Sequence, residues 1–240
     1  MRTYRDDAVV LRTHKLGEAD RIVVLLTKGR GKVRAVAKGV RKTKSRFGGR
    51  LEPPGHVALQ LYEGRNLDTV TQAESIELFP GIRADLGRMT DAMALLEAVD
   101  QVSQEGEATP ALHTMLTGAL RTLDRSASPL LVGAFYWKLL TLEGVMPVLD
   151  GCARCGASAD AVELVAFDPA EGGALCRACR RGPALTSGGL SLIKAVLGGG
   201  LSAALAVPAG PATAEVTDLA TRSLEHHLER RLRAAHMLTH

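Results

Sequence analysis

The first 80 residues alternate between apolar and polar side chains with a period of two, which is typical of β-strands that bury one face. Runs rich in Val, Leu and Thr are separated by turns, and two of these turns contain the glycines that tight hairpins favour. Five short antiparallel strands, with one long loop after the third, predict a small closed barrel. An oligonucleotide-binding (OB) barrel fits this size, and an SH3-like barrel is the alternative. The five runs are 6–14, 20–28, 32–40, 56–64 and 67–78.

From Phe79-Pro80 onward the apolar residues recur with the period of helices. The stretch 85–104 is expected to form the first long helix, with a single apolar stripe along it. The residues of this stripe are Leu86, Met89, Met93, Leu96 and Val99.

Thr109-Pro110 and Ser128-Pro129 each resemble a helix start, with an N-cap residue followed by proline in the first turn. They predict helices over 111–125 and 130–145. The second helix is apolar almost all round, which indicates a place at the centre of a bundle.

Further helices are expected over 187–197 and about 213–238, with Val216, Leu219, Leu224 and Leu228 toward the core and a loop or linker at 198–212. The fold class predicted is therefore α+β with several domains. An OB-like barrel (1–80) precedes a helical domain (81–240), and a cysteine-containing insertion interrupts the helices at about 150–182.

Basic residues are concentrated in the first part of the chain. Residues 1–80 contain 16 Lys and Arg against 9 Asp and Glu, and the segment 28–50 contains ten basic residues and no acidic one. We call 28–50 the basic segment. Like charges at this density repel one another, so the segment indicates an anionic partner such as a nucleic acid rather than a merely solvated surface. Lys32 and Arg34 share one strand face, and Lys38 extends that row. The candidate DNA-binding residues are Lys32, Arg34, Lys38, Arg41, Lys42, Lys44, Arg46 and Arg50.

Aromatic residues, which stack on bases in many single-strand-binding proteins, are scarce here. Within the basic segment there is only Phe47, which could be a stacking ring or a loop anchor; Tyr62 is more typical of cross-strand packing. The expected binding mode is therefore contact with phosphates, with little sequence preference.

Four cysteines form two CxxC pairs, Cys152/Cys155 and Cys176/Cys179. This spacing is typical of paired zinc knuckles, and four thiolates would fill the coordination sphere of a structural zinc ion. Gly156 and Gly173 flank the pairs. A redox pair or free core thiols are the alternatives. Four nearby arginines are either an auxiliary DNA contact or solvated side chains: Arg154, Arg177, Arg180 and Arg181.

The sequence gives no support for catalysis. The glycines at 29–31 resemble a phosphate loop, but Val33 stands where a magnesium-binding hydroxyl is needed, and Glu225-His226-His227 lacks the HExxH spacing. No apolar run is long enough to span a membrane, and the charged N-terminus does not resemble a signal peptide. We therefore expect a non-enzymatic cytoplasmic protein with no membrane partner.

The combination of a basic barrel with a helical domain and a CxxC…CxxC insertion resembles the RecO family of bacterial DNA-repair proteins. This resemblance implies a recombination mediator that binds single- and double-stranded DNA, anneals complementary strands and works with RecR. It also implies help in loading the RecA recombinase onto strands coated by single-stranded-DNA-binding protein, at the nucleoid. The stretches that carry the resemblance are 19–42, 52–64, 139–156 and 167–179.

Two other classes of protein remain open from the residues alone. The same basic barrel would suit an RNA-binding module. Alternatively, the helical domain would be an interaction scaffold, and the basic segment would dock an acidic protein.

Overall fold

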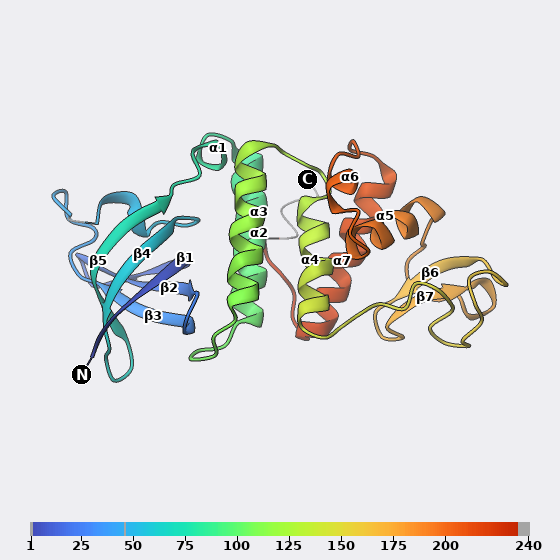
Figure 1. Cartoon of the computed structure of the whole chain (residues 1–240), viewed down its shortest axis with the longest axis horizontal. Coiled ribbons are helices and arrows are strands. Elements are labelled where there is room, and N and C mark those ends of the chain that lie inside the picture. The colour runs from blue at the N-terminus through green and yellow to red at the C-terminus, as the bar shows by residue number, and fades with distance from the viewer. Residues whose placement is uncertain (1, 46, 235–240) are drawn as a thin grey trace. The chain divides into compact units, whose positions relative to one another are not determined.

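The computed structural model describes residues 2–45 and 47–234. The described residues form two compact units (Figure 1): residues up to Ser126 make up the first, and the second begins at Ala127. Within the described residues, the first unit contains a barrel and three helices, and the second contains four helices and a small two-stranded sheet.

Five strands close into a barrel in the order β1-β2-β3-β5-β4. Antiparallel pairs join all neighbours except β3 and β5, which pair in parallel through Ala35 with Asp68 and Val36 with Thr69. This order is that of an OB barrel, so the prediction of an OB-like barrel followed by helices is confirmed. The strands are β1 (Thr3–Leu16), β2 (Asp20–Thr27), β3 (Gly31–Ala37), β4 (His56–Tyr62) and β5 (Asp68–Glu77).

The barrel is closed and filled by two features. β1 pairs with both β2 and β4, and its register with β2 shifts between Val10 and Arg12; such a bulge bends a strand and lets it belong to two sides of a barrel. The loop after β3 contains a 3-10 turn, η1 (Gly48–Leu51), and this turn places Phe47 and Leu51 in the barrel core.

Helices α1 (Pro80–Arg83), α2 (Leu86–Val102) and α3 (Pro110–Arg125) complete the first unit. The predicted stripe on α2 is partly wrong. Leu96 and Val99 are buried, but Leu86 is 84% exposed and Met93 is also exposed. The close-packed surface of α2 includes alanines instead, because α2 contacts both β1 and α3 and small side chains let these neighbours approach.

In the second unit, α4 (Leu131–Leu142) is buried along most of its length, as its apolar sequence predicts. It begins later than expected, since Pro129 and Leu130 form a turn before it. The helix α5 (Ser187–Leu197) matches its predicted bounds.

Two other predictions for the second unit need correction. The expected loop at 198–212 contains the short helix α6 (Leu201–Leu205). The last helix, α7 (Pro211–Leu228), ends earlier than predicted because Glu229 adopts a left-handed conformation with φ 50°. The predicted end of that helix at 235–238 lies outside the described residues.

Two buried histidines lie where α3 packs on the barrel. The ring centroids of His56 and His113 are 5.4 Å apart, and both residues are at least 95% buried. Glu77 joins this cluster, with Oε2 3.0 Å from His56 Nδ1 and Oε1 2.8 Å from Arg121 Nε. Among the described residues, neither imidazole Nε2 has a hydrogen-bond partner.

The burial of His113 between α3 and the barrel predicts that the stability of the protein falls at acidic pH. Burial, followed by the nearby His56, lowers the pKa of His113 to about 4 from an ordinary value of about 6.5. The unfolded chain therefore takes up a proton first as the pH falls, and stability is lost from about pH 6.5 downward. We expect about 2 kcal/mol of stability to be lost between pH 7 and pH 5 through this residue. Urea unfolding at both pH values should show a smaller loss for His113→Gln than for the unaltered protein. An identical pH dependence in the two proteins would contradict the prediction.

Candidate nucleic-acid interface and metal site

The basic loop, residues 38–45, leaves the end of β3 and carries the densest charge of the basic segment. Lys38, Lys42 and Lys44 are exposed. None of these three lysines has an acidic partner among the described residues. Their charges are therefore available to a ligand, which makes the loop the strongest candidate phosphate-binding surface in the first unit.

Arg41, in the same loop, makes contacts within the protein. Its Nη1 donates to the carbonyl oxygens of Glu18 at 2.9 Å and Gly17 at 3.3 Å, in the turn between β1 and β2. The backbone N–H of Gly39 donates to Asp20 Oδ1 at 2.7 Å. These bonds tie the basic loop to the β1–β2 turn.

Lys32 and Arg34 share an outer face of the barrel, as their spacing predicts, and this face meets α2. Lys32 Nζ donates to the backbone oxygen of Asp100 at 2.6 Å, near the C-terminus of α2, and is 3.5 Å from its carboxylate. Arg34 pairs with Glu105 at 2.9 Å. The Asp100 carboxylate also forms an ion pair with Arg12, with Oδ2 2.6 Å from Arg12 Nε, and Asp100 is only 8% exposed. Unlike the exposed lysines of the basic loop, these two cations therefore have acidic partners within the protein.

The remaining candidates lie after the basic loop. Arg50 is exposed and donates to the carbonyl of Phe47 at 3.1 Å, whereas Arg46 lies outside the described residues. Phe47 is 1% exposed and belongs to the barrel core, so it is a loop anchor and not a stacking ring. Tyr62 is partly exposed at the end of β4, where its backbone pairs with β1 and β5.

Sequence patterns did not identify the acidic residues that organise this surface. Asp20 and Asp100 lie outside the basic segment in sequence. An acidic residue is also not a residue type that predicts binding to a polyanion. The only local signal is the position of Asp20 at the start of β2, directly after a turn.

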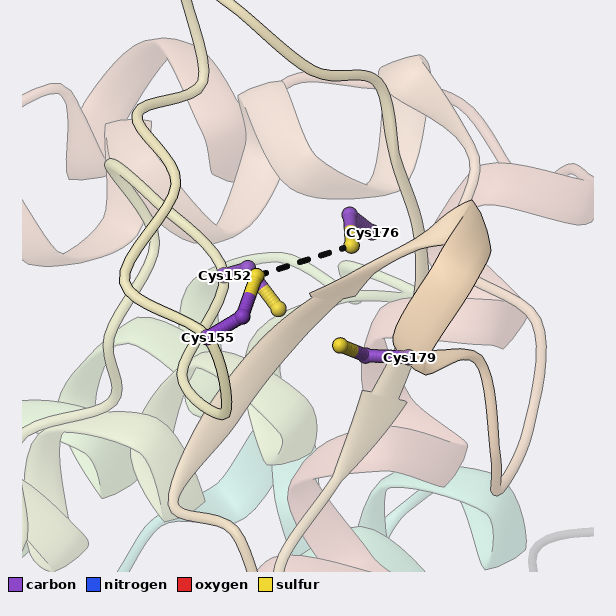
Figure 2. Close-up of side chains that lie close together, drawn as sticks. All are labelled: Cys152, Cys155, Cys176 and Cys179. Atoms are coloured by element: carbon purple, nitrogen blue, oxygen red, sulfur yellow. Dashed lines mark hydrogen bonds between the residues drawn. The ribbon is translucent and has the colours of Figure 1, made fainter.

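The four cysteines form a compact cluster in the second unit (Figure 2), although they come from two separate stretches of the chain. Cys152 and Cys155 lie on a turn, and Cys176 ends β7 (Gly173–Cys176), which pairs with β6 (Leu164–Asp168). Cys179 lies in the 3-10 turn η2 (Arg177–Cys179) that follows. We call residues 150–182 the cysteine module.

Local backbone geometry shapes both turns. Gly156 has φ 75°, which a residue with a side chain rarely adopts. Gly173 packs against Val148, so that a Cβ at this position would lie 2.4 Å from the Val148 carbonyl oxygen. Phe167 of β6 contacts Trp137 of α4 edge to face, with centroids 5.5 Å apart, and thereby anchors the cysteine module to the helices.

The geometry of the sulfurs fits a tetrahedral metal ion. All four Sγ atoms lie within 4.8 Å of one another, and those of Cys155 and Cys176 are 3.9 Å apart. Four sulfurs at about 2.3 Å from a zinc ion would be separated by about 3.8 Å. The cluster is therefore compatible with a structural zinc.

The electrostatics of the cluster also favour a cation. Burial raises the pKa of the Cys152 thiol, but hydrogen bonds from the backbone N–H groups of Cys155, Cys176 and Arg154 outweigh it and lower that pKa to about 6. Burial and hydrogen bonds with the other thiols raise the pKa of Cys179 to about 12. A lowered pKa at Cys152 favours a thiolate there, which attracts a cation, and metal binding by thiols generally releases the protons of the ligands.

The four arginines of the cysteine module differ in their surroundings. Arg177 pairs with Glu163 at 2.8 Å, and Arg181 pairs with Asp168 and Glu171. Arg154 and Arg180 are exposed, and in the described part of the chain neither has an acidic partner. Any anion contact by this module would therefore involve Arg154 and Arg180 first.

These features define a class of protein in which an OB barrel with an exposed basic loop precedes a helical unit with a four-cysteine cluster. Two family models match the chain: "Recombination protein O N terminal" matches residues 1–79, and "Recombination protein O C terminal" matches residues 83–236. Together these matches cover nearly the whole chain, and the chain belongs to the RecO family.

Family membership places the protein in DNA repair and recombination, with DNA as a ligand, and confirms the resemblance seen in the sequence. None of the described helices combines the length and the hydropathy needed to cross a membrane.

Proposed function

We propose that this protein is a non-enzymatic recombination mediator whose barrel, residues 1–80, binds the phosphates of single- and double-stranded DNA. The observation that carries this proposal is the exposure of Lys38, Lys42 and Lys44 on one loop without acidic partners. Arg46 and Arg50 extend the surface in sequence, while Lys32 and Arg34 contribute less, because acidic residues already offset their charge.

The proposal includes a structural zinc ion, held by Cys152, Cys155, Cys176 and Cys179. The ion would fix the fold of the cysteine module, since four protein ligands leave no open coordination position for chemistry. The chain itself positions the sulfurs, through backbone N–H groups that donate to Cys152 and through the packing of the cysteine module on α4.

The wider role that we propose follows from the family. The protein would anneal complementary strands and assist the loading of recombinase onto strands coated by single-stranded-DNA-binding protein, together with RecR, in the cytoplasm at the nucleoid. Annealing brings two polyanions together, and a surface of unpaired lysines would offset their repulsion.

Two assays with the purified protein test this function. Titration of labelled single-stranded DNA, duplex DNA and RNA at several salt concentrations should show DNA binding that weakens steeply with salt. Mixing complementary strands should show annealing that is faster than the spontaneous reaction, independent of ATP and suppressed by high salt. A strong preference for RNA would favour an RNA-binding module. Retention on heparin without DNA binding would favour a scaffold, and an absolute requirement for ATP would refute the annealing mechanism.

A further inference from the structure

Hydrogen bonds attach the basic loop to the β1–β2 turn, and within the loop Val40 packs against the barrel core. Three groups of hydrogen bonds make this attachment: Gly39 N–H to Asp20 Oδ1 at 2.7 Å, Arg41 N–H to the Ala19 carbonyl at 3.0 Å, and the Arg41 guanidinium to the carbonyls of Glu18 and Gly17. We call this set of bonds the clasp. Inside the loop, two backbone bonds fold the chain into successive turns, from Lys42 to Gly39 and from Ser45 to Lys42.

The clasp acts on the conformation of the loop. Gly39 has φ 68°, a conformation that reverses the chain direction after β3. Its N–H donates the hydrogen bond that Asp20 Oδ1 accepts. Without this acceptor, the loop would sample more conformations, because backbone residues gain conformational entropy when they are released. Lys38 and Lys42 stand on either side of the clasped residues, so their spacing depends on the clasp.

We propose that Asp20 and Arg41 are positioning residues for DNA binding, which hold the basic loop in its binding conformation, and that Lys38, Lys42 and Lys44 are the phosphate-contacting residues. This inference rests on the proposed DNA-binding function. It assigns a supporting role to an acidic residue on a surface that binds a polyanion.

Substitutions of Asp20 provide a test, because removal of its charge and loss of its hydrogen bond are expected to change DNA affinity in opposite directions. Asp20→Asn and Asp20→Ala both remove one negative charge, which by electrostatics alone would strengthen DNA binding. Asn retains a carbonyl oxygen that can accept from Gly39, whereas Ala does not. We expect Asp20→Asn to bind a labelled oligothymidylate as tightly as the unaltered protein or more tightly. We expect Asp20→Ala to bind about tenfold more weakly, as when the competent conformer falls to about a tenth of the population.

A matched pair of neighbouring cations gives a second test. Arg41→Gln and Lys42→Gln each remove one positive charge from adjacent positions. Loss of a phosphate contact lowers the slope of log K against log salt by about 0.7 for a single strand, whereas loss of loop order lowers affinity at constant slope, because the bound state keeps its contacts. We therefore expect a reduced slope for Lys42→Gln and weaker binding with an unchanged slope for Arg41→Gln.

Amide hydrogen exchange of the free proteins supplies a readout that does not depend on DNA. The Gly39 and Arg41 amides should exchange faster in Asp20→Ala than in Asp20→Asn, while barrel core amides remain protected in both variants. Equal DNA affinity for Asp20→Ala and Asp20→Asn, or equal losses of slope for Arg41→Gln and Lys42→Gln, would overturn the inference. If the unaltered protein bound no DNA at any salt concentration, the proposed function itself would be refuted, and the positioning role with it.

Discussion

Replacing Cys176 with serine is expected to unfold the cysteine module and to abolish stoichiometric zinc binding. The module buries only a small set of apolar side chains, among them Leu164, Phe167 and Leu175, so we expect a bound zinc ion to supply much of its folding free energy. Structural zinc contributes about 10–16 kcal/mol in small zinc-binding peptides, and loss of one of four ligands removes a large part of this contribution. Metal analysis should find one zinc per chain in the unaltered protein and little in Cys176→Ser.

Limited proteolysis locates the effect within the chain. We expect Cys176→Ser to be cleaved within residues 150–182, while the barrel remains resistant and still binds DNA. Arg177→Gln is the matched control, because it changes the adjacent residue but removes only an exposed ion pair, worth about 1 kcal/mol or less. Purified protein without zinc, or a Cys176→Ser variant with the stability of the control, would contradict the prediction.

Reversing the charge of Lys38, Lys42 and Lys44 together is expected to weaken DNA binding by at least about 100-fold at 0.1 M salt. Each phosphate contact with a single strand adds about 0.7 to the salt slope, which corresponds to about fivefold in affinity at this salt concentration, and the three glutamates add repulsion. The loss should be similar for all sequences, since phosphates carry no sequence information. The slope of log K against log salt should fall by about 2.

The control for this variant lies in the cysteine module. Arg154→Glu with Arg180→Glu reverses exposed charges that also lack acidic partners among the described residues. We expect this double variant to retain most of the affinity for DNA, as measured by fluorescence anisotropy with the same labelled strands. If the triple lysine variant bound normally and the double arginine variant did not, the main DNA surface would lie on the cysteine module.

The strands were predictable because their signal is local. Alternation along each run and the glycine turns at 28–31 and 63–66 specify strand and hairpin without reference to the rest of the chain. The cysteine pairs were predictable for a similar reason, since the CxxC spacing already restricts where two sulfurs can point. The stripe on α2 was only partly predictable, because a helix packed on two sides uses small residues that hydropathy patterns do not single out.

The sequence by itself determined that Lys32 and Arg34 share one face of a strand, and that a dense group of cations follows on the next loop. Only the tertiary structure decided which cations stay available. Asp100 in the last turn of α2 and Glu105 just after α2 are far away in sequence, but the fold brings them to Lys32 and Arg34. It likewise brings Asp20 and the β1–β2 turn to Gly39 and Arg41. Periodicity reports the direction of a side chain relative to its own strand, whereas the charge that a surface presents depends on which distant groups the fold brings within hydrogen-bond distance.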